Sequence, residues 1–265
     1  MKKILLILLI ALAALIGWLC VPFNILVIGV DAYANQPTEG SRSDGLIVIR
    51  VIPYLAQIKM VSIPRDTYAE IPCENYKQDK ITHSHHFGGT QCTIDAVENL
   101  LDTKINYHVR FRFEDVMNIT NLIDGVDVVA NHTFNQDYFG QEVFHFNQGE
   151  VYNLRGRMAL AYTRHRKSDT TTKREERQRQ VIQGIAKKIA APSGWKYIPE
   201  VYGYAKEKMD IAVNPIKGLS VLPAFLLNKK IEQYEINGDG RMINGIWYFI
   251  PEETSLENAK DEFKN

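Results

Sequence analysis

The sequence NILVIGV at residues 24–30 decides the fold. It is a short apolar run that ends at a glycine, a pattern typical of a buried strand. Two further runs of this kind follow, GLIVIR at residues 45–50 and QIKMVSI at residues 57–63, with a turn at Pro53 and Tyr54 between them. The three runs predict neighbouring strands.

Beyond these strands, segments with helical periodicity alternate with short apolar runs. The expected helices lie at residues 93–101, 113–123, 154–162, 174–189, 199–210 and 215–227. The expected strands lie at residues 107–111, 126–129, 231–236 and 246–250, the last two around NGDG at 237–240, and residues 133–150 form a loop or hairpin. This alternation predicts a single α/β domain with a central mixed β-sheet flanked by helices.

The chain begins with Lys2 and Lys3, followed by an apolar run over residues 4–23. A run of about 20 residues is long enough to cross a bilayer as a helix. The two lysines predict a cytoplasmic N-terminus, which places everything after the run outside the cytoplasm. A cleaved signal peptide and a lipoprotein signal are the alternatives. The run lacks a small-x-small cleavage site and has the bulky Leu19 before Cys20, so an uncleaved anchor is the favoured interpretation.

Composition restricts the partners and the compartment. The formal net charge of the 265 residues is +0, which argues against a protein that generally coats nucleic acid. Basic residues are concentrated between 155 and 188, and the tail from Glu252 onward is acidic. Cys73 and Cys92 lie near each other in the exported part, where an oxidising environment favours a disulfide between them; two free thiols are the alternative.

Acidic residues and arginines stand at the ends of the three strands. Asp31 follows the first strand, Arg42 and Asp44 precede the second, and Arg65 and Asp66 follow the third. Ligand sites of open sheets lie where strand ends converge, so these side chains are expected to meet in one cleft. Solvent-exposed turns are the alternative for each element taken alone, since aspartate is common in turns.

An arginine-rich stretch later in the chain indicates the kind of ligand. In the sequence YTRHR at residues 162–166, an extended backbone would direct Tyr162, Arg164 and Arg166 toward one side. Arginine grips phosphate oxygens through paired, charge-assisted hydrogen bonds, and neighbouring aspartates indicate a divalent metal that also contacts phosphate. The early aspartates and the late arginines together predict a phosphate-handling site.

The sequence REERQ at residues 174–178 opens a predicted helix. Arg174, Arg177 and Gln178 share one face of that helix, and the same face continues as Val181 and Ile185. A polar first turn above an apolar stripe predicts a helix whose N-terminal end projects into the site while the remainder packs in the core. The N-terminus of the helix also favours anions. Surface arginines on an ordinary amphipathic helix are the alternative.

These elements, in this order behind one N-terminal anchor, resemble the LytR-CpsA-Psr family of cell-envelope enzymes. The resemblance covers about residues 24 to 190, and the matching segments are residues 24–31, 41–44, 62–67, 87–89, 124–127, 161–166 and 174–178. It implies a phosphotransferase that moves a glycan or teichoic-acid chain from a polyprenyl pyrophosphate carrier onto peptidoglycan, with magnesium or manganese. It also implies an apolar pocket between sheet and helices for the lipid tail.

The resemblance implies a role for each matching side chain. Asp31 and Asp44 would hold the metal. Asp66 and Asp169 would act with Arg65 at the reacting centre, by orienting arginines or by acting on the acceptor hydroxyl. The side chains expected to grip the pyrophosphate are Arg42, Arg65, Lys80, Arg164, Arg166, Arg174, Arg177 and Gln178.

Two segments depart from the family pattern. Threonines occupy residues 170–172, where the family often has an aspartate before the first arginine of REERQ, and Asp169 lies earlier. Before the FGG segment at 87–89, the chain has His83, His85 and His86, which could bind a transition metal or else line the phosphate cleft or the loop surface. The roles of Asp169 and of the three histidines therefore stay open.

The leading hypothesis is a membrane-anchored, extracytoplasmic phosphotransferase that moves a polyprenyl-linked glycopolymer to peptidoglycan or another envelope acceptor. A polyprenyl pyrophosphate hydrolase and a non-catalytic envelope-binding or regulatory protein are the alternatives. A nucleic-acid-binding regulator is disfavoured, because the anchor places the domain outside the cytoplasm. The expected organisation is an anchor at 1–23, a catalytic core at 24–190, further elements of the same domain at 191–250 and an acidic tail at 251–265.

Overall fold

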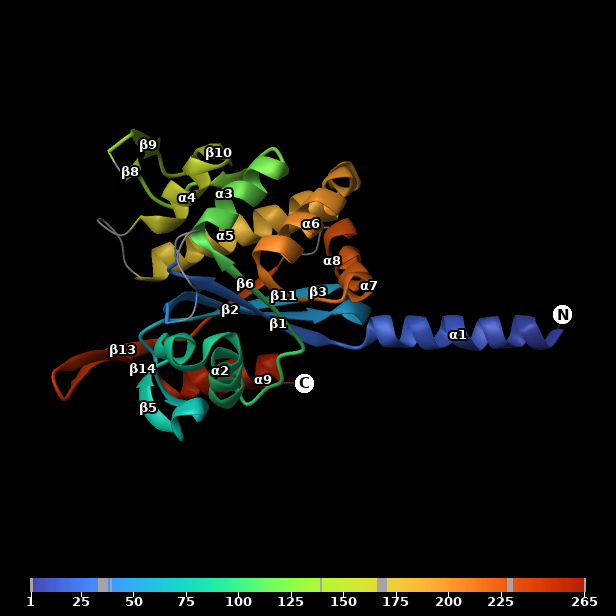
Figure 1. Ribbon diagram of the computed structural model, residues 1–265, viewed down its shortest axis with the longest axis horizontal. Coiled ribbons are helices and arrows are strands. Elements are labelled where there is room, and N and C mark those ends of the chain that lie inside the picture. The colour runs from blue at the N-terminus through green and yellow to red at the C-terminus, as the bar shows by residue number, and fades with distance from the viewer. Residues whose placement is uncertain are drawn as a thin grey trace.

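A six-stranded sheet forms the middle layer of the structure, a computed structural model that describes residues 2–32, 38, 40–138, 140–165, 171–227 and 231–264. Its strands are, in spatial order, β11 (Asp210–Ala212), β6 (Tyr107–Arg112), β1 (Phe23–Val30), β2 (Ser43–Ile52), β3 (Gln57–Ile63) and β12 (Glu232–Glu235). β1 pairs in parallel with β6 and antiparallel with β2. The sheet is therefore mixed, as predicted, and helices cover both of its faces (Figure 1).

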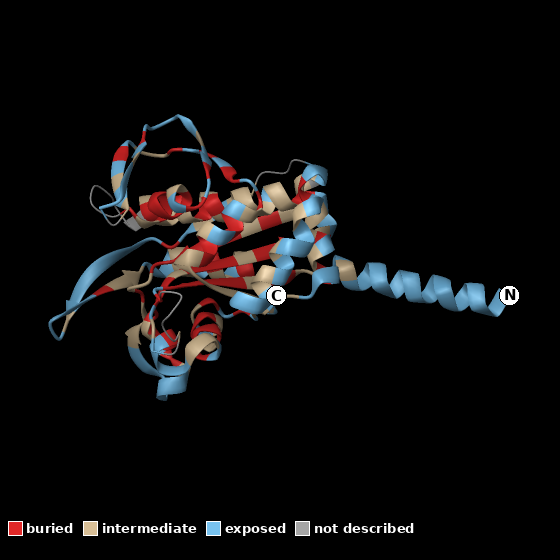
Figure 2. Ribbon diagram, turned by 45° about the horizontal axis from the view of Figure 1, so that its top comes forward, coloured by how far each residue is buried: buried red, intermediate tan, exposed pale blue. Residues whose placement is uncertain are grey.

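The central strands are apolar on both faces, which is why they lie in the middle of the sheet. Leu26 and Ile28 of β1 belong to the core on one face, whereas Val27 belongs to the core on the other. Figure 2 shows these buried strands between the two helical layers. The predicted strands at 24–30, 45–50 and 57–63 are confirmed, and the turn between the last two is the short 3-10 helix η1 (Pro53–Leu55).

One face of the sheet is covered by α2 (His83–Leu101), which begins well before the predicted start at residue 93 and has non-helical backbone at Gly88 and Gly89. A disulfide between Cys73 and Cys92 joins η2 (Pro72–Glu74) to α2, which confirms the predicted pairing. The hairpin of β4 (Tyr68–Ile71) and β5 (Lys77–Lys80) lies between β3 and α2 in the chain and packs in the same layer.

The C-terminal segment is a packed helix rather than the predicted acidic tail. In α9 (Glu253–Phe263), Ala259 and Phe263 are buried in the same core as β1 and α2. The carbonyl of Phe263 accepts hydrogen bonds from Asn24 Nδ2 at 3.1 Å and Arg50 Nη1 at 3.2 Å. Glu253, Glu257 and Asp261 are exposed on the outer face of this amphipathic helix and Glu262 pairs with Lys59 of β3, so the charge of the segment does not prevent it from packing.

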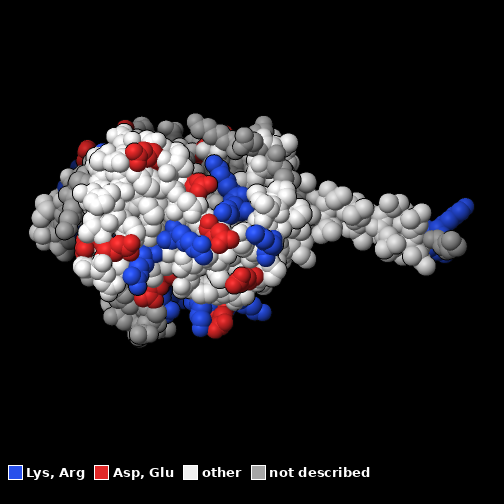
Figure 3. Space-filling model, turned by 90° about the horizontal axis from the view of Figure 1, so that it is seen from above, with Lys and Arg blue, Asp and Glu red and all other residues white. Residues whose placement is uncertain are grey.

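The other face is covered by α3 (Phe113–Leu122), α4 (Arg157–Arg164), α5 (Thr171–Ala190) and α6 (Ile198–Lys208), with η3 (Pro192–Tyr197) between the last two. Two strand pairs lie beside these helices: β7 (Val126–Val129) with β10 (Val151–Leu154), and β8 (Phe134–Tyr138) with β9 (Glu142–Phe146). The hairpin expected within 133–150 is confirmed. Lysine, arginine and acidic side chains are interspersed over this helical face (Figure 3).

Two C-terminal predictions are wrong in detail. The helix expected at 215–227 is divided into α7 (Pro215–Gly218), η4 (Leu219–Val221) and α8 (Leu222–Leu226), and Pro223 lies in the first turn of α8, where proline is tolerated. The hairpin of β13 (Gly238–Ile243) and β14 (Ile246–Pro251) turns at Asn244 and Gly245, not at 237–240. Both turn residues have positive φ, of 50° and 79°, which Asn-Gly pairs adopt readily.

The helix α1 (Lys2–Cys20) projects from one end of the domain and has no buried residue (Figures 1 and 2). Its 19 residues are long and apolar enough to cross a membrane, which agrees with the predicted anchor. Basic side chains mark its free end in Figure 3.

Candidate functional site

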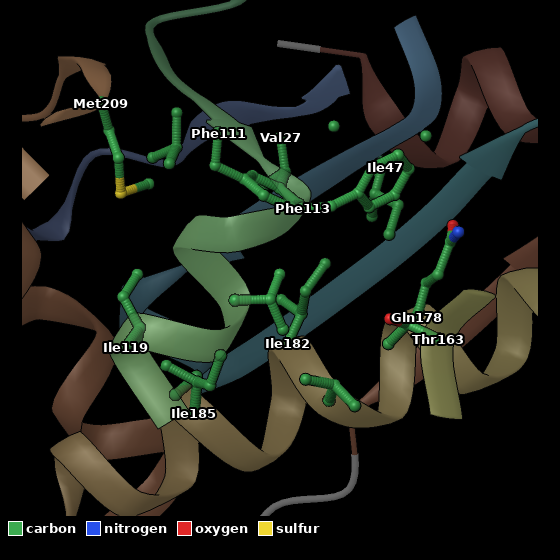
Figure 4. A pocket seen from close by; sticks show the side chains of 16 residues that line it. Val27, Ile47, Phe111, Phe113, Ile119, Thr163, Gln178, Ile182, Ile185 and Met209 are labelled. Atoms are coloured by element: carbon green, nitrogen blue, oxygen red, sulfur yellow. The ribbon is translucent and has the colours of Figure 1, made fainter. Parts of the chain in front are cut away.

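A cavity of about 240 Å³ lies between the sheet and the helices α3 and α5. Its walls are formed almost entirely by apolar side chains of β1, β2, β6, α3 and α5 (Figure 4). The labelled apolar residues are Val27, Ile47, Phe111, Phe113, Ile119, Ile182, Ile185 and Met209. A cavity of this composition is suited to an aliphatic chain.

The cavity has one polar end. Gln178 and Thr163 lie together there, away from Ile119 and Ile185 at the opposite end (Figure 4). A Cβ atom added at Gly45 would lie 3.3 Å from Gln178 Oε1, so the glycine allows the start of α5 to approach β2 closely. The apolar stripe that the sequence predicts below REERQ is confirmed, because the residues following Gln178 on α5 line this cavity.

Four charged side chains form a row beside this polar end. Asp44, which directly precedes Gly45, accepts from Arg65 Nη1 at 2.9 Å. Arg65 Nε lies 3.4 Å from Asp66 Oδ2, and Asp66 Oδ1 lies 2.8 Å from Lys80 Nζ. Burial alone would lower the pKa of Arg65, but the carboxylates of Asp44 and Asp66 outweigh it and raise that pKa. The predicted convergence of strand ends is thus observed for Asp44, Arg65 and Asp66.

The backbone that carries Arg65 and Asp66 is held in place by other elements. The carbonyl of Arg65 accepts from Thr82 N at 3.1 Å, and that of Asp66 accepts from Phe249 N at 2.9 Å. Thr67 donates its hydroxyl to the Pro64 carbonyl at 2.6 Å, which closes the turn. The two side chains therefore project from a backbone that is ordered before any ligand binds, which lowers the entropic cost of binding.

Asp31 and Arg42 lie at the same edge of the sheet, because Val30 of β1 pairs with Ser43 of β2. The amide of Asp31 donates to the carbonyl of Arg42 at 3.1 Å, and both residues are exposed. Asp31, Arg42 and Asp44 are therefore grouped around one β1–β2 end.

The backbone at Arg164 differs from the predicted extended form. α4 continues through Arg164, because Leu160 and Tyr162 are buried against neighbouring elements and hold the helix to its end. The Arg164 guanidinium lies 5.1 Å from the ring centre of Phe113, which lines the cavity. Arg166 and Asp169 lie outside the described residues.

Arg177, which the sequence predicts as a pyrophosphate contact, lies at the junction of α4 and α5. It is fully buried, and it donates to the carbonyls of Tyr162 at 2.8 Å and His165 at 3.0 Å. Its guanidinium also lies 4.8 Å from the ring centre of Phe134. Arg177 thus fastens the C-terminal end of α4 to α5. Arg174 is also buried, at the start of α5.

Two further side chains of α5, Arg179 and Glu175, were not predicted from the sequence to be site residues. Arg179 is 1% exposed and donates to Ser62 Oγ at 2.8 Å and to Glu235 Oε1 at 3.0 Å. Burial raises the pKa of Glu175 to about 7, against the opposing effect of Arg174 and Arg179. A carboxyl with this pKa can exchange a proton near neutral pH. In the sequence, the four-residue spacing of Glu175 and Arg179 indicates that the two side chains are neighbours on one helix face.

The three histidines do not converge on a metal site. Their Nδ1 atoms contact three separate groups: His83 with Asp79 Oδ2 at 2.9 Å, His85 with the Ser41 carbonyl at 3.0 Å, and His86 with the Gly40 carbonyl at 2.6 Å. Within the described ranges, no cluster of three or more His, Cys, Asp or Glu side chains has metal-binding geometry. The transition-metal interpretation of this segment is therefore wrong.

An apolar cavity that ends at a row of paired arginine, lysine and aspartate side chains defines a site for an amphiphilic ligand with an anionic head. This site stands on a mixed-sheet α/β domain behind a candidate transmembrane helix. The chain belongs to the LytR_cpsA_psr family, which matches residues 21–265.

Individual relatives agree with this assignment. The polyisoprenyl-teichoic acid–peptidoglycan teichoic acid transferase TagU of Bacillus licheniformis is 36% identical over 246 residues, which cover 92% of this chain and 77% of that protein. The crystal structure of B. subtilis TagV matches with a TM-score of 0.81 and 29% identity, covering 92% of this chain and 96% of that one. The family protein YwtF (TagT) with bound octaprenyl pyrophosphate lipid matches with a TM-score of 0.69 and 25% identity, covering 91% and 88%.

Proposed function

We propose that this protein is a membrane-anchored transferase that moves a glycopolymer, of the teichoic-acid type, from a polyprenyl pyrophosphate carrier to peptidoglycan or another envelope acceptor. The observation that carries the proposal is the junction of the apolar cavity with the row Asp44–Arg65–Asp66–Lys80. A polyprenyl pyrophosphate is likewise divided into an apolar part and a charged part, because its apolar chain is joined to a head that carries two or more negative charges. The transferase name of the TagU relative and the lipid bound to TagT support the same substrate class.

The cavity is the proposed site of the polyprenyl chain. Each methylene-sized group that leaves water for such a cavity contributes about 0.8 kcal/mol. With its chain between α3 and α5, the lipid would place its pyrophosphate at the Gln178 end, beside Arg65 and Lys80. Both cations pair with Asp66 in the described structure, and a bound pyrophosphate would compete with that carboxylate for them.

The reaction would break the P–O–P bond of the carrier. The hydroxyl oxygen of the acceptor attacks the phosphorus that bears the glycan and forms a new P–O bond, and polyprenyl phosphate leaves with the electrons of the broken bond. The proton of the hydroxyl passes to a nearby base, for which Asp66 is the proposed group. Arg65 and Lys80 would balance the negative charge that develops on the phosphate oxygens, which is the main demand of phosphoryl transfer.

A divalent metal, magnesium or manganese, is part of the proposal. Asp44 and Asp31 are oxygen ligands at one edge of the sheet, and Mg²⁺ is commonly bound by one or two carboxylates together with substrate phosphates. The two residues fit such a half-site, with the phosphates and water completing it. When bound, the ion would neutralise charge on the phosphates. The proposed topology has the N-terminus in the cytoplasm and the domain outside it, as Lys2 and Lys3 predict.

The experiment follows the release of polyprenyl phosphate from a polyprenyl pyrophosphate-linked glycan by the full chain in detergent, with and without peptidoglycan and with and without EDTA. Arg65→Met should lower the transfer rate by about 10²–10³-fold, the usual cost of removing one charge-stabilising donor. Ile182→Trp, which fills the cavity, should lower retention of the lipid. Arg241→Met, at an exposed position of β13, is the control and should transfer normally.

The outcomes separate the parts of the proposal. Normal transfer by Arg65→Met would refute the site. Release that is equally fast without peptidoglycan would identify a pyrophosphate hydrolase, with water as the acceptor. Transfer that persists in EDTA would remove the metal from the proposal and leave the transferase intact.

A further inference from the structure

A buried lysine of α7, Lys217, joins the helix α1 to the domain. Lys217 of α7 donates from Nζ to the carbonyls of Trp18 at 2.6 Å and Val21 at 2.7 Å. The same ammonium lies 5.2 Å from the ring centre of Trp18 and 5.0 Å from that of Phe23. The last carbonyls of a helix lack the usual donors four residues further on, and Lys217 donates to one of them, that of Trp18, and to the carbonyl of Val21 just after the helix. Because β1 begins at Phe23, the domain follows α1 without a long flexible linker.

Exposed apolar side chains surround this junction. Tyr54 and Leu55 of η1 are 63% and 54% exposed, and Ile216 of α7 and Leu219 of η4 are each 54% exposed. Both η1 and η4 contact α1. These four side chains, which we name the apolar ledge, therefore stand beside the point where the transmembrane helix enters the domain.

We propose that the apolar ledge docks on the lipid bilayer, in the interfacial region of the leaflet from which α1 emerges. The argument for a bilayer, rather than for a second copy of the chain, is continuity with α1, whose apolar surface must itself lie in lipid. Trp18 lies in the last turn of α1, and tryptophan and tyrosine are enriched at membrane interfaces. An apolar surface held at that level by Lys217 would enter the headgroup region rather than water.

The docking would orient the cavity relative to the membrane. The helix α8 follows η4 and packs on α5, which lines the cavity, so a ledge resting on the bilayer holds the cavity at a set height above it. The orientation of the cavity matters only for the delivery of a lipid carrier and therefore rests on the proposed function. The docking of the apolar ledge on the bilayer does not depend on that function.

The experiment measures the depth of single fluorescent labels on the full chain in liposomes. Cys20 is the free cysteine of the described part, so Cys20→Ser leaves the Cys73–Cys92 disulfide as the background. Leu55→Cys and Leu219→Cys are labelled with an environment-sensitive dye. The matched controls are Val143→Cys on β9 and Met242→Cys on β13, exposed apolar positions at the end of the domain away from α1 (Figure 1). Lipids with a nitroxide near the headgroup are the quencher.

Labels at 55 and 219 should be quenched and shifted to shorter wavelength, as expected for a surface roughly 5–10 Å into the headgroup boundary. Labels at 143 and 242 should behave as in water. Equal quenching at all four positions would overturn the proposal. Cross-linking between the cysteines at 55 of two copies, without quenching, would also overturn it and identify a second chain as the partner. Because all four positions are exposed, the labelled variants should melt at the temperature of the unlabelled background.

Discussion

Glu175 predicts an unusual dependence of stability on pH. Its carboxyl is influenced electrostatically by the buried Arg174 and Arg179 and by Glu235 at the β12 edge of the sheet. Burial is the largest cause that raises its pKa from 4.5 to about 7. Replacing it by glutamine keeps the shape of the side chain and removes the titration. The substitution therefore isolates the effect of this one proton.

The size of the effect follows from the difference between folded and unfolded pKa values. Below about pH 4, Glu175 is protonated in both states and the substitution changes little. As the pH rises from about 4.5 to about 7, the unfolded chain loses its proton first, so the native protein loses stability. At about 1.4 kcal/mol for each pKa unit, the loss reaches about 3 kcal/mol near pH 8. Glu175→Gln should therefore be more stable than the parent by about that amount at pH 8.

The assay is urea unfolding of the full chain in detergent, followed by tryptophan fluorescence at several values from about pH 4 to about pH 8. The free energy of unfolding of Glu175→Gln should exceed that of the parent increasingly across this range. Glu142→Gln, at an exposed position of β9, is the control and should differ little at any pH. A difference for Glu175→Gln that is the same at all pH values, or that grows as the pH falls, would refute the reasoning.

Two further predictions concern stability. Cys73→Ser removes the disulfide to Cys92, which closes a loop between residues 19 apart in sequence and contributes about 3 kcal/mol. The free energy of unfolding should fall by about 3 kcal/mol, and added reductant should not lower it further in the variant. A reductant effect of the same size in the variant as in the parent would contradict this prediction. Arg179→Met keeps the buried aliphatic part of the side chain but removes the donor to Ser62 and Glu235. The free energy of unfolding, followed by thermal melting, should fall by roughly 1–3 kcal/mol, whereas Arg241→Met at an exposed position should leave it almost unchanged. Equal melting temperatures of the two variants would contradict this prediction.

The regular elements were predictable where the pattern is local. β3 spans the predicted residues 57–63, and α5 extends the predicted 174–189 by only a few residues, because apolar runs and helical periodicity are written in consecutive residues. α4 was less predictable, because its last turn is stabilised by Arg177 from another helix. The acidic composition of residues 251–265 concealed α9, whose Phe263 packs beneath β1.

The candidate site was predictable in its residue types and less so in their roles. Asp44, Arg65 and Asp66 were expected at strand ends, and they form one row with Lys80, which only the family resemblance had assigned to the site. In sequence, Arg177 of the REERQ segment and the following Arg179 cannot be distinguished from exposed arginines, yet both are buried and donate to protein oxygens. A guanidinium contacts ligand or protein according to which segments surround it, and that information is not local.

The sequence alone determined the strand-rich core, the apolar N-terminal helix and the presence of acids and arginines at strand ends, since each depends on neighbouring residues. The tertiary structure decided which charges pair and which surfaces stay open. Arg65 meets Asp44 across 21 residues, Arg179 meets Glu235 across 56, and Lys217 caps α1 at Trp18 across 199. Such pairs form only after the chain has folded, because burial brings the partners together and makes an unpaired charge costly.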